Sequence, residues 1–336
     1  MQLENYLLKL DEKSYIKKGS DSIRLYNLGP IIESIYKDLK KFKPIADIEK
    51  ASKTHQTYSN WILNKTGISI QEFYSLCNYW KLTCHKTDKQ LFVLWNKIYK
   101  NSYYFGCTNG KQIRLPKVLD SNLAYLLGVI MGDGHLANPD RSYDKLTTYN
   151  SEIRITSGDR STFVNLSKIF EALFHYKPRI YSELSKVNRK FYRFVIKSKP
   201  IHRFLMNICG VPIGKKCYKI DVLPLIKNAP LKLQKKFIVG FIDADGCIRL
   251  AKQRYPMVSV SQLDPRILEY IINFSKLLGI KWNGPYKSHH PNNRNSMIYL
   301  SDKVNFKKYL KHFSPIDPTR KEQVKFVLSH MYGRAP

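Results

Sequence analysis

The sequence predicts an α+β protein in which a mostly helical N-terminal region precedes two similar repeats. Three observations predict this. An apolar segment closed by an acid and a glycine occurs twice, at 126–134 and at 238–246. A similar order of predicted strands and helices follows each copy. The two copies are separated by the length of one small domain, which indicates an internal repeat.

The region before the first copy predicts helices, because apolar residues recur at helical spacing in 45–52, 54–63, 68–80 and 88–99. Two alternatives fit the first two predicted helices. They could form a helix-turn-helix that contacts DNA, or a helical bundle that packs against the rest of the protein. In the first case the second helix would expose His55, Gln56, Tyr58, Ser59 and Asn60. Asn109-Gly110 between apolar runs then predicts a hairpin.

The two duplicated segments predict helices with small residues four positions apart. These are Gly128 and Gly132 in the first copy, and Gly240 and Ala244 in the second. Such a stripe is smooth enough for two helix backbones to approach closely. We therefore expect the two helices to pack against each other through these four residues.

An aspartate ends each of these helices. The glycine after Asp133 and after Asp245 predicts a left-handed helix cap at both places. The two carboxylates would then lie at the negative ends of two adjacent helix dipoles, which is unfavourable. A cation should compensate this charge, and divalent metal ions between paired carboxylates and a phosphate are the obvious candidates.

Strands and helices are predicted after each motif helix from residue periodicity. In the first repeat, strands are predicted at 152–156, 179–184 and 189–197, and helices at 159–174 and 200–208. In the second repeat, strands are predicted at 247–253, 257–261, 282–287 and 297–300, and helices at 265–278 and 304–313. This order favours one antiparallel sheet in each repeat.

The charge balance favours a polyanionic partner. The chain of 336 residues has 57 Lys and Arg against 26 Asp and Glu, a net charge of +31. Charge alone would also fit an RNA-binding, ribosomal or membrane-surface protein. No apolar stretch is long enough for a bilayer and no secretory signal opens the chain, so an intracellular protein is expected, cytoplasmic or in an organelle. The six cysteines lack zinc-site spacing.

The second motif, from Gly240 to Gly246, resembles the signature of the LAGLIDADG homing endonucleases almost letter for letter, apart from Phe241. The first copy departs at Met131 and Gly132 but keeps the acid and the flanking glycines. The resemblance implies a monomer of the two-motif type, with two pseudo-symmetric αββαββα repeats. Their sheets would together form a saddle over the major groove of DNA.

A sheet face on DNA should carry basic or amide side chains at alternate positions. In the strand from Arg189, Arg189, Arg193 and Lys197 fall on one side and Tyr192, Phe194 and Ile196 on the other. The predicted DNA-binding residues are Arg154, Arg189, Arg193, Lys197, Arg249 and Gln253.

The resemblance also implies a catalytic site. Asp133 and Asp245, with Gly132 and Ala244, would hold Mg²⁺ or Mn²⁺. Further catalytic residues that the family pattern implies are Lys199, Lys303, Gln262 and Arg266. The first repeat has Ser157 at the position of the glutamine, so the two active sites should differ and one strand should be cut faster.

The sequence therefore predicts a site-specific endonuclease for double-stranded DNA. The expected divisions are 1–115 as an accessory region, 116–215 as the first repeat and 216–336 as the second. An intron RNA maturase and an inactive DNA-binding regulator are the alternatives on this scaffold, and intron RNA is a possible partner. Met1 and the ending Gly333 to Pro336 lack the residues that intein splicing needs, so a free-standing enzyme is expected.

Overall fold

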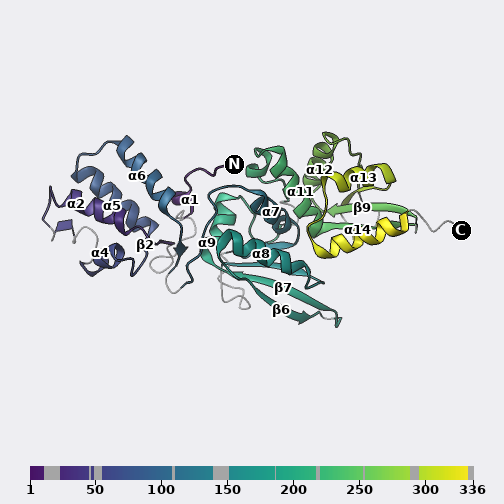
Figure 1. Ribbon diagram of the computed structural model, residues 1–336, viewed down its shortest axis with the longest axis horizontal. Coiled ribbons are helices and arrows are strands. Elements are labelled where there is room, and N and C mark those ends of the chain that lie inside the picture. Colours follow the sequence, from purple (N-terminus) through teal and green to yellow (C-terminus); the bar gives the residue numbers. More distant parts are fainter. Residues whose placement is uncertain are drawn as a thin grey trace. The chain divides into compact units, whose positions relative to one another are not determined.

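The computed structural model describes residues 1–10, 23–44, 47–48, 55–107, 110–138, 151–185, 187–216, 220–252, 254–287 and 295–331 (Figure 1). Contacts divide the chain into two compact units. Unit 1 consists of Met1–Gln2, Val118–Lys197 and Cys209–Pro336, and unit 2 of Leu3–Lys117 and Ser198–Ile208. Both predicted repeats contribute their sheets to unit 1. In the described part of the chain, no helix is long and apolar enough to span a membrane.

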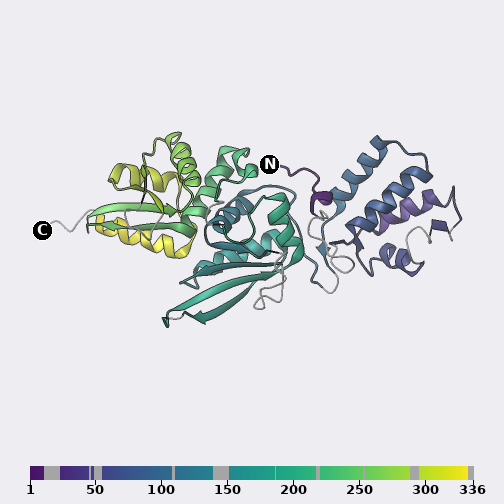
Figure 2. The ribbon, with the colours of Figure 1, turned by 180° about the vertical axis from the view of Figure 1, so that it is seen from behind.

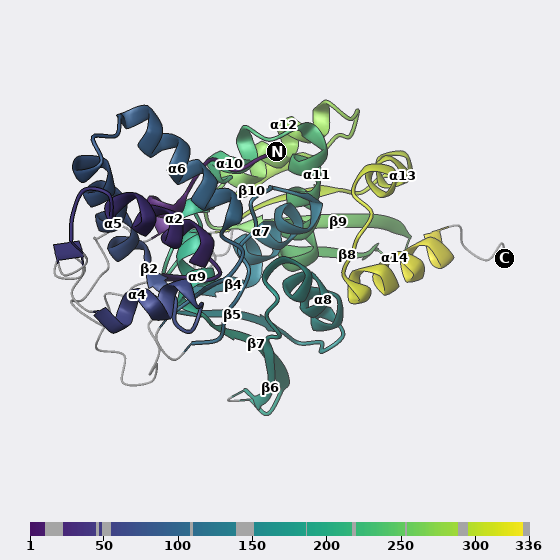
Figure 3. The ribbon, with the colours of Figure 1, turned by 60° about the vertical axis from the view of Figure 1, so that its left-hand side comes forward.

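The first repeat begins with α7 (Ser121–Asp133), a mostly buried helix. It continues with β4 (Gly134–Leu136), β5 (Glu152–Ser157), α8 (Thr162–Phe174), β6 (Arg179–Leu184) and β7 (Lys190–Lys197). The strands form an antiparallel sheet in the order β4-β5-β7-β6, which can be followed in Figure 3. After β7 the chain enters α9 (Lys199–Arg203) and the π-helix η2 (Phe204–Ile208), both in unit 2.

The second repeat has the same order. After α10 (Pro224–Lys227) come α11 (Leu231–Asp245), β8 (Gly246–Ala251), β9 (Tyr255–Gln262), α12 (Arg266–Lys276), β10 (Asn283–Lys287), β11 (Ser296–Leu300) and α13 (Lys303–His312). Its sheet order, read from the β8 edge, is β8-β9-β11-β10, which matches the order β4-β5-β7-β6 of the first repeat position by position. The predicted α+β fold with two αββαββα repeats is therefore confirmed, and Figure 2 shows both sheets from behind.

Each sheet has one apolar face on a helical layer. In the first repeat, the ring of Phe194 on β7 packs against Phe163 and Phe170 of α8, with centroids 5.3 and 5.4 Å apart. These three rings are fully buried. Helical spacing on α8 and alternation on β7 together bring them to one side, so the opposite face of the sheet is left for other contacts.

The sequence pattern gave no sign of the last helix, α14 (Pro318–Met331), which lies beside β8 and β9. Only Val327 and Met331 are buried in it, so its apolar periodicity is too weak to predict a helix. Its start is nevertheless well defined. Asp317 accepts a hydrogen bond from the Arg320 amide at 3.0 Å, and Pro318 follows directly.

Unit 2 contains the mostly helical N-terminal region. Its elements are α1 (Leu7–Leu10), β1 (Arg24–Leu25), α2 (Gly29–Leu39), α4 (His55–Ile62), β2 (Ile68–Ser69), α5 (Ile70–Thr83), α6 (Asp88–Asn101) and β3 (Phe105–Gly106). Capping boxes start α5, at Ser69 and Glu72, and α6, at Thr87 and Gln90. The predicted exposure of Tyr58 is wrong, because its ring packs between Tyr36 and Trp61 and is 3% exposed.

Two other N-terminal expectations fall partly outside the described residues. Most of the helix predicted at 45–52 does so, as does Asn109 of the predicted hairpin. The segments on either side of Asn109 pair as a hairpin requires, since Phe105 and Ile113 exchange two backbone hydrogen bonds of 2.8 Å. The division into 1–115, 116–215 and 216–336 stays a prediction, while by contacts 198–208 group with the N-terminal residues.

Candidate active site

The two motif helices, α7 and α11, pack with their backbones in direct contact. A Cβ atom on Gly128 would lie 2.1 Å from the carbonyl oxygen of Phe237, and one on Gly240 would lie 2.1 Å from that of Tyr125. Real Cβ contacts are never that short, so only glycine fits at these crossing points. The close approach brings the C-terminal ends of the two helices together.

The glycines that follow the two aspartates are not left-handed caps, so that prediction is wrong. Gly134 has φ −78° and Gly246 has φ −81°, both extended backbone that any residue can adopt. Space explains these glycines instead. A Cβ would lie 2.6 Å from the Ile130 oxygen at Gly134 and 2.4 Å from the Ile242 oxygen at Gly246. At both positions the backbone passes directly from the helix into a strand. The glycine lies against the last turn of the helix that it follows.

Asp133 ends α7 and Asp245 ends α11, and the two lie close together. A Cβ on Gly132 would be 3.1 Å from Asp245 Oδ2 and 2.6 Å from the Ala244 Cβ. Asp133 is exposed, whereas Asp245 is half-buried. The arrangement places two carboxyl groups from different repeats beside each other at one end of the helix pair.

Both carboxyl groups hold protons more tightly than an ordinary aspartate. The Asp133 side chain reaches solvent, but the protein around it still desolvates the carboxyl and raises its pKa, against the lowering effect of the Lys216 and Arg320 charges. Desolvation and the neighbouring Asp133 charge raise the pKa of Asp245 to about 7. A divalent cation between these groups would favour their ionised forms, and it would relieve the repulsion from Asp133 that adds to the raised pKa of Asp245.

Two cations cap the motif helices. The Lys216 ammonium donates hydrogen bonds to the carbonyl oxygens of Ile130, Met131 and Gly132, at 2.6, 3.0 and 3.0 Å, at the end of α7. Arg320 performs the same role for α11. Its guanidinium donates to the carbonyl oxygens of Asp243 at 3.0 Å and Ala244 at 3.1 Å.

These two residues supply part of the positive charge that the helix dipoles and the acids require. Sequence reasoning missed both of them. In a chain with 57 lysines and arginines, a single lysine or arginine far from the motif gives no signal of its own. Gly132 and Ala244, which were predicted to join the metal site, contribute their carbonyl oxygens to these caps.

The two halves of the site differ in the residue at the end of the second strand of each repeat. Gln262, at the end of β9, donates its side-chain amide to Asp245 Oδ2 and is 8% exposed. Ser157 stands at the matching end of β5, and its hydroxyl accepts the amide of Asp159 at 3.1 Å. The structure therefore brings the predicted Gln262 to its aspartate, and gives Ser157 a role in the following turn.

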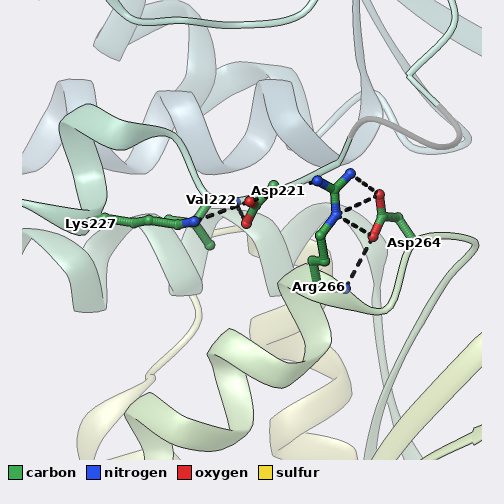
Figure 4. A network of polar contacts seen from close by, with 5 residues as sticks. All are labelled: Asp221, Val222, Lys227, Asp264 and Arg266. Atoms are coloured by element: carbon green, nitrogen blue, oxygen red, sulfur yellow. Dashed lines mark hydrogen bonds and ion pairs between the residues drawn. The ribbon is translucent and has the colours of Figure 1, made fainter.

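Arg266, another predicted catalytic residue, is held by carboxylates outside the aspartate pair (Figure 4). Its guanidinium pairs with the buried Asp264, with Nε 2.9 Å from Oδ1, and lies 4.0 Å from Asp221. Asp221 also accepts from Lys227 at 3.1 Å. The arginine thus helps to fix the start of α12.

The two predicted lysines open helices. Lys199 is the first residue of α9, in unit 2. Lys303 is the first residue of α13, is exposed, and follows Asp302, which caps that helix. The cations whose charges lower the pKa of Asp245 are Lys216 and Arg320. Catalytic roles for Lys199 and Lys303 stay predictions.

Asp243 has a structural role on the opposite side of α11. Its Oδ2 accepts hydrogen bonds from Tyr125 Oη at 3.0 Å and from the amides of Ile316 and Asp317 at 2.8 and 2.9 Å. The carboxyl is 8% exposed. Asp243 therefore ties α11 to its partner helix and to the segment that starts α14.

The oxygen donors at the site fit a hard divalent cation, but they would supply only part of its coordination. Carboxylate oxygens are ligands that Mg²⁺ and Mn²⁺ accept, and Mg²⁺ commonly binds through one or two carboxylates plus substrate phosphates. Within the described ranges, no group of three or more His, Cys, Asp or Glu residues could hold a metal ion. Asp133 and Asp245 would therefore need a phosphate and water to complete the coordination.

Four of the six predicted DNA-binding residues lie on the sheets of unit 1. By strand register, Arg154, Arg193 and Lys197 share the side of the first sheet away from α8. Arg189 is exposed in the turn before β7, and Arg249 is exposed on β8. Gln253 lies outside the described residues. Two of the arginines are paired, Arg154 with Glu152 and Arg193 with Glu183 at 2.8 Å.

The raised pKa of Asp245 predicts a pH-dependent stability. The folded protein binds this proton more tightly than the unfolded chain, so stability falls as pH rises from about 4 to about 7 and stays reduced above that. Asp245→Asn removes the penalty. We expect the variant to be more stable than the wild type by about 2 kcal/mol at pH 8, and little different at pH 4. Melting temperatures at both pH values, without divalent metal, test this. A pH-independent difference would contradict it.

Comparisons with known proteins find several similar proteins. Residues 231–311 match the family model described as homing endonuclease. The homing endonuclease I-ApeI of Aeropyrum pernix is 28% identical over 166 residues, which are 49% of this chain and 69% of I-ApeI. The tRNA-splicing ligase RtcB of Methanopyrus kandleri is 28% identical over 183 residues, but the match spans only 17% of that protein. A structure of I-DmoI in complex with DNA and Ca covers 62% of this chain and 97% of I-DmoI, at 17% identity and a TM-score of 0.41.

Proposed function

Because the chain belongs to the LAGLIDADG homing endonuclease family, we propose that it is a site-specific endonuclease that cuts both strands of a long duplex DNA target. The observation that carries this proposal is the pair of aspartates, one from each repeat, at the adjoining ends of α7 and α11. Two acids related by the repeat suit two phosphodiester bonds, one in each strand. We propose that the protein acts as a monomer, because one chain supplies both acids.

In this proposal Asp133 and Asp245 hold Mg²⁺ or Mn²⁺ at the DNA backbone. The metal supplies Lewis acidity at the phosphate and lowers the pKa of bound water. Lys216 and Arg320 offset the charge of the acids and fix the two helix ends. The side-chain amide of Gln262 orients the carboxyl of Asp245. Catalytic roles for Lys199, Lys303 and Arg266 remain predictions.

The test uses the DNA sequences on the two sides of the gene, joined to each other as they would be in the absence of the inserted gene. Mg²⁺-dependent double-strand cutting of that junction, with none in a chelator, is expected. If DNA is bound but never cut under any divalent metal, a DNA-binding regulator is the better assignment. If folded intron RNA is bound and its splicing promoted while duplex DNA is left intact, a maturase is the better assignment.

Unequal partners at the two acids predict unequal strand cleavage. Asp245 accepts from Gln262, whereas the matching Ser157 is engaged by the turn at Asp159. We expect a nicked intermediate to accumulate, with one strand cut several-fold faster, and Gln262→Ala to slow one nick more than the other. Conversion of a supercoiled target to nicked and then linear DNA measures the intermediate, and strand-specific end labels on a linear target measure both rates. Equal rates at early times would contradict this prediction.

A further inference from the structure

We infer that the two sheets read the two halves of the DNA target through different chemistry, guanine edges and phosphates on the first and thymine methyl groups on the second. The inference rests on the proposed function and specifies its substrate. It follows from the strand register and exposure of the two sheet faces that point away from the helical layers. We define face 1 as the side of the first sheet that carries Arg154, Arg179, Arg193 and Lys197. Face 2 is the side of the second sheet that carries Arg249, Tyr255, Tyr286 and Tyr299.

Face 1 is defined by the pairing of its strands. Arg154 on β5 and Arg179 on β6 lie on either side of Val195 of β7, so all three share one side of the sheet. Lys197 pairs with Glu152, and Arg193 lies between Thr156 and Tyr181. The other side holds the core, where Phe194 meets α8.

Face 1 is strongly basic. It carries three arginines and a lysine against Glu152 and Glu183, together with the aromatic residues Phe191 and Tyr181, of which Tyr181 is 40% exposed. The ion pairs of Arg154 with Glu152 and Arg193 with Glu183 fix the guanidinium groups without burying them, since both arginine side chains stay about 30% exposed. A fixed, accessible guanidinium is the group that reads guanine O6 and N7 through two parallel hydrogen bonds.

Face 2 has a different composition. Its register joins Arg249 to Met257, Ala251 to Tyr255, and Met297 to both Ser261 and Tyr286. Tyr255 is 53% exposed and Tyr286 is 52% exposed, although both belong to strands. The rings of Tyr286 and Tyr299 lie with centroids 5.9 Å apart, which places them on the same side.

Arg249 is the only charged residue among the described strand positions of face 2. This is notable in a chain with 57 lysines and arginines. Solvent exposure of aromatic rings is unfavourable unless a partner covers them. In a DNA groove, the apolar contact available to rings and thioethers is the C5-methyl of thymine. Face 2 therefore suits a thymine-containing half-site, read with few charges.

The difference can be tested by changing single atoms of the DNA. A cleavable target is first isolated from a randomised duplex pool with the wild-type protein. Binding is then measured in Ca²⁺ with uracil in place of thymine, or 7-deazaguanine in place of guanine, in one half at a time. We expect uracil in one half to weaken binding at least about fivefold, and 7-deazaguanine to do so in the other half.

Variants assign each half to its face. In Tyr286→Ala the uracil effect should shrink to less than about twofold while the 7-deazaguanine effect remains, and in Arg193→Ala the reverse should hold. Phe92→Ala, which changes an exposed aromatic residue on α6 in unit 2, outside both faces, should keep both effects. Equal uracil effects in both halves, or effects that these variants leave unchanged, would overturn the inference. Failure to isolate any bound or cut duplex would instead overturn the proposed function.

Discussion

Asp133→Asn and Asp245→Asn are each expected to reduce double-strand cleavage by roughly a thousandfold or more, while specific DNA binding persists. Asparagine keeps the shape of the side chain and removes the charge. A neutral amide at either position cannot hold a divalent cation against water when only two carboxylates contribute. Cleavage rates and binding constants for the same target, in saturating Mg²⁺, measure the two effects separately.

The control for this experiment is Asp302→Asn. Asp302 caps α13 by accepting the Asn305 amide at 2.7 Å, and asparagine is an equally good capping residue. The control should cut at close to the wild-type rate. Unfolding cannot explain a loss of cleavage in Asp245→Asn, because that variant is expected to gain stability at neutral pH. Full cleavage by either motif variant would rule out the proposed metal site.

Gly128→Ala is expected to destabilise the protein by about 3 kcal/mol or more, and to lower its melting temperature by several degrees. The added methyl would lie 2.1 Å from the Phe237 oxygen and 2.7 Å from the Phe241 nitrogen, both backbone atoms of α11. Backbone cannot rotate away as a side chain can, so the two helices must separate. Since the helix ends carry the aspartates, cleavage should fall as well.

Gly158→Ala is the matched control, because no atom lies within 4 Å of the position that its Cβ would take. Thermal unfolding of the two variants and the wild type, at one pH and ionic strength, gives the comparison. Gly240→Ala should resemble Gly128→Ala, since its Cβ would meet the Tyr125 oxygen from the other helix. A Gly128→Ala protein as stable as the Gly158→Ala control would show that the helices are not packed as described.

Much of the fold could be predicted from local pattern. The strand predicted at 179–184 is β6 to the residue, and both motif helices end at the predicted aspartates. Such features depend on side chains that are close in sequence, where alternation and helical spacing are visible. The missed helix α14 had too few buried residues to produce a pattern. The sequence correctly indicated that the glycines after the acids are important, but for the wrong reason. A lack of space for a Cβ atom and a left-handed backbone both require glycine, so the sequence cannot distinguish the two causes.

The sequence by itself determined that this protein has two related repeats and which acid ends each motif helix, because both are encoded in a short segment that occurs twice. Only the tertiary structure decided which cations serve those acids. Lys216 and Arg320 reach the helix ends from distant parts of the chain, and Arg266 is held instead by Asp264. Electrostatic interactions depend on distance in space, whereas the sequence gives only distance along the chain. Which two of the many cations lie at the helix ends is therefore determined by the path of the folded backbone.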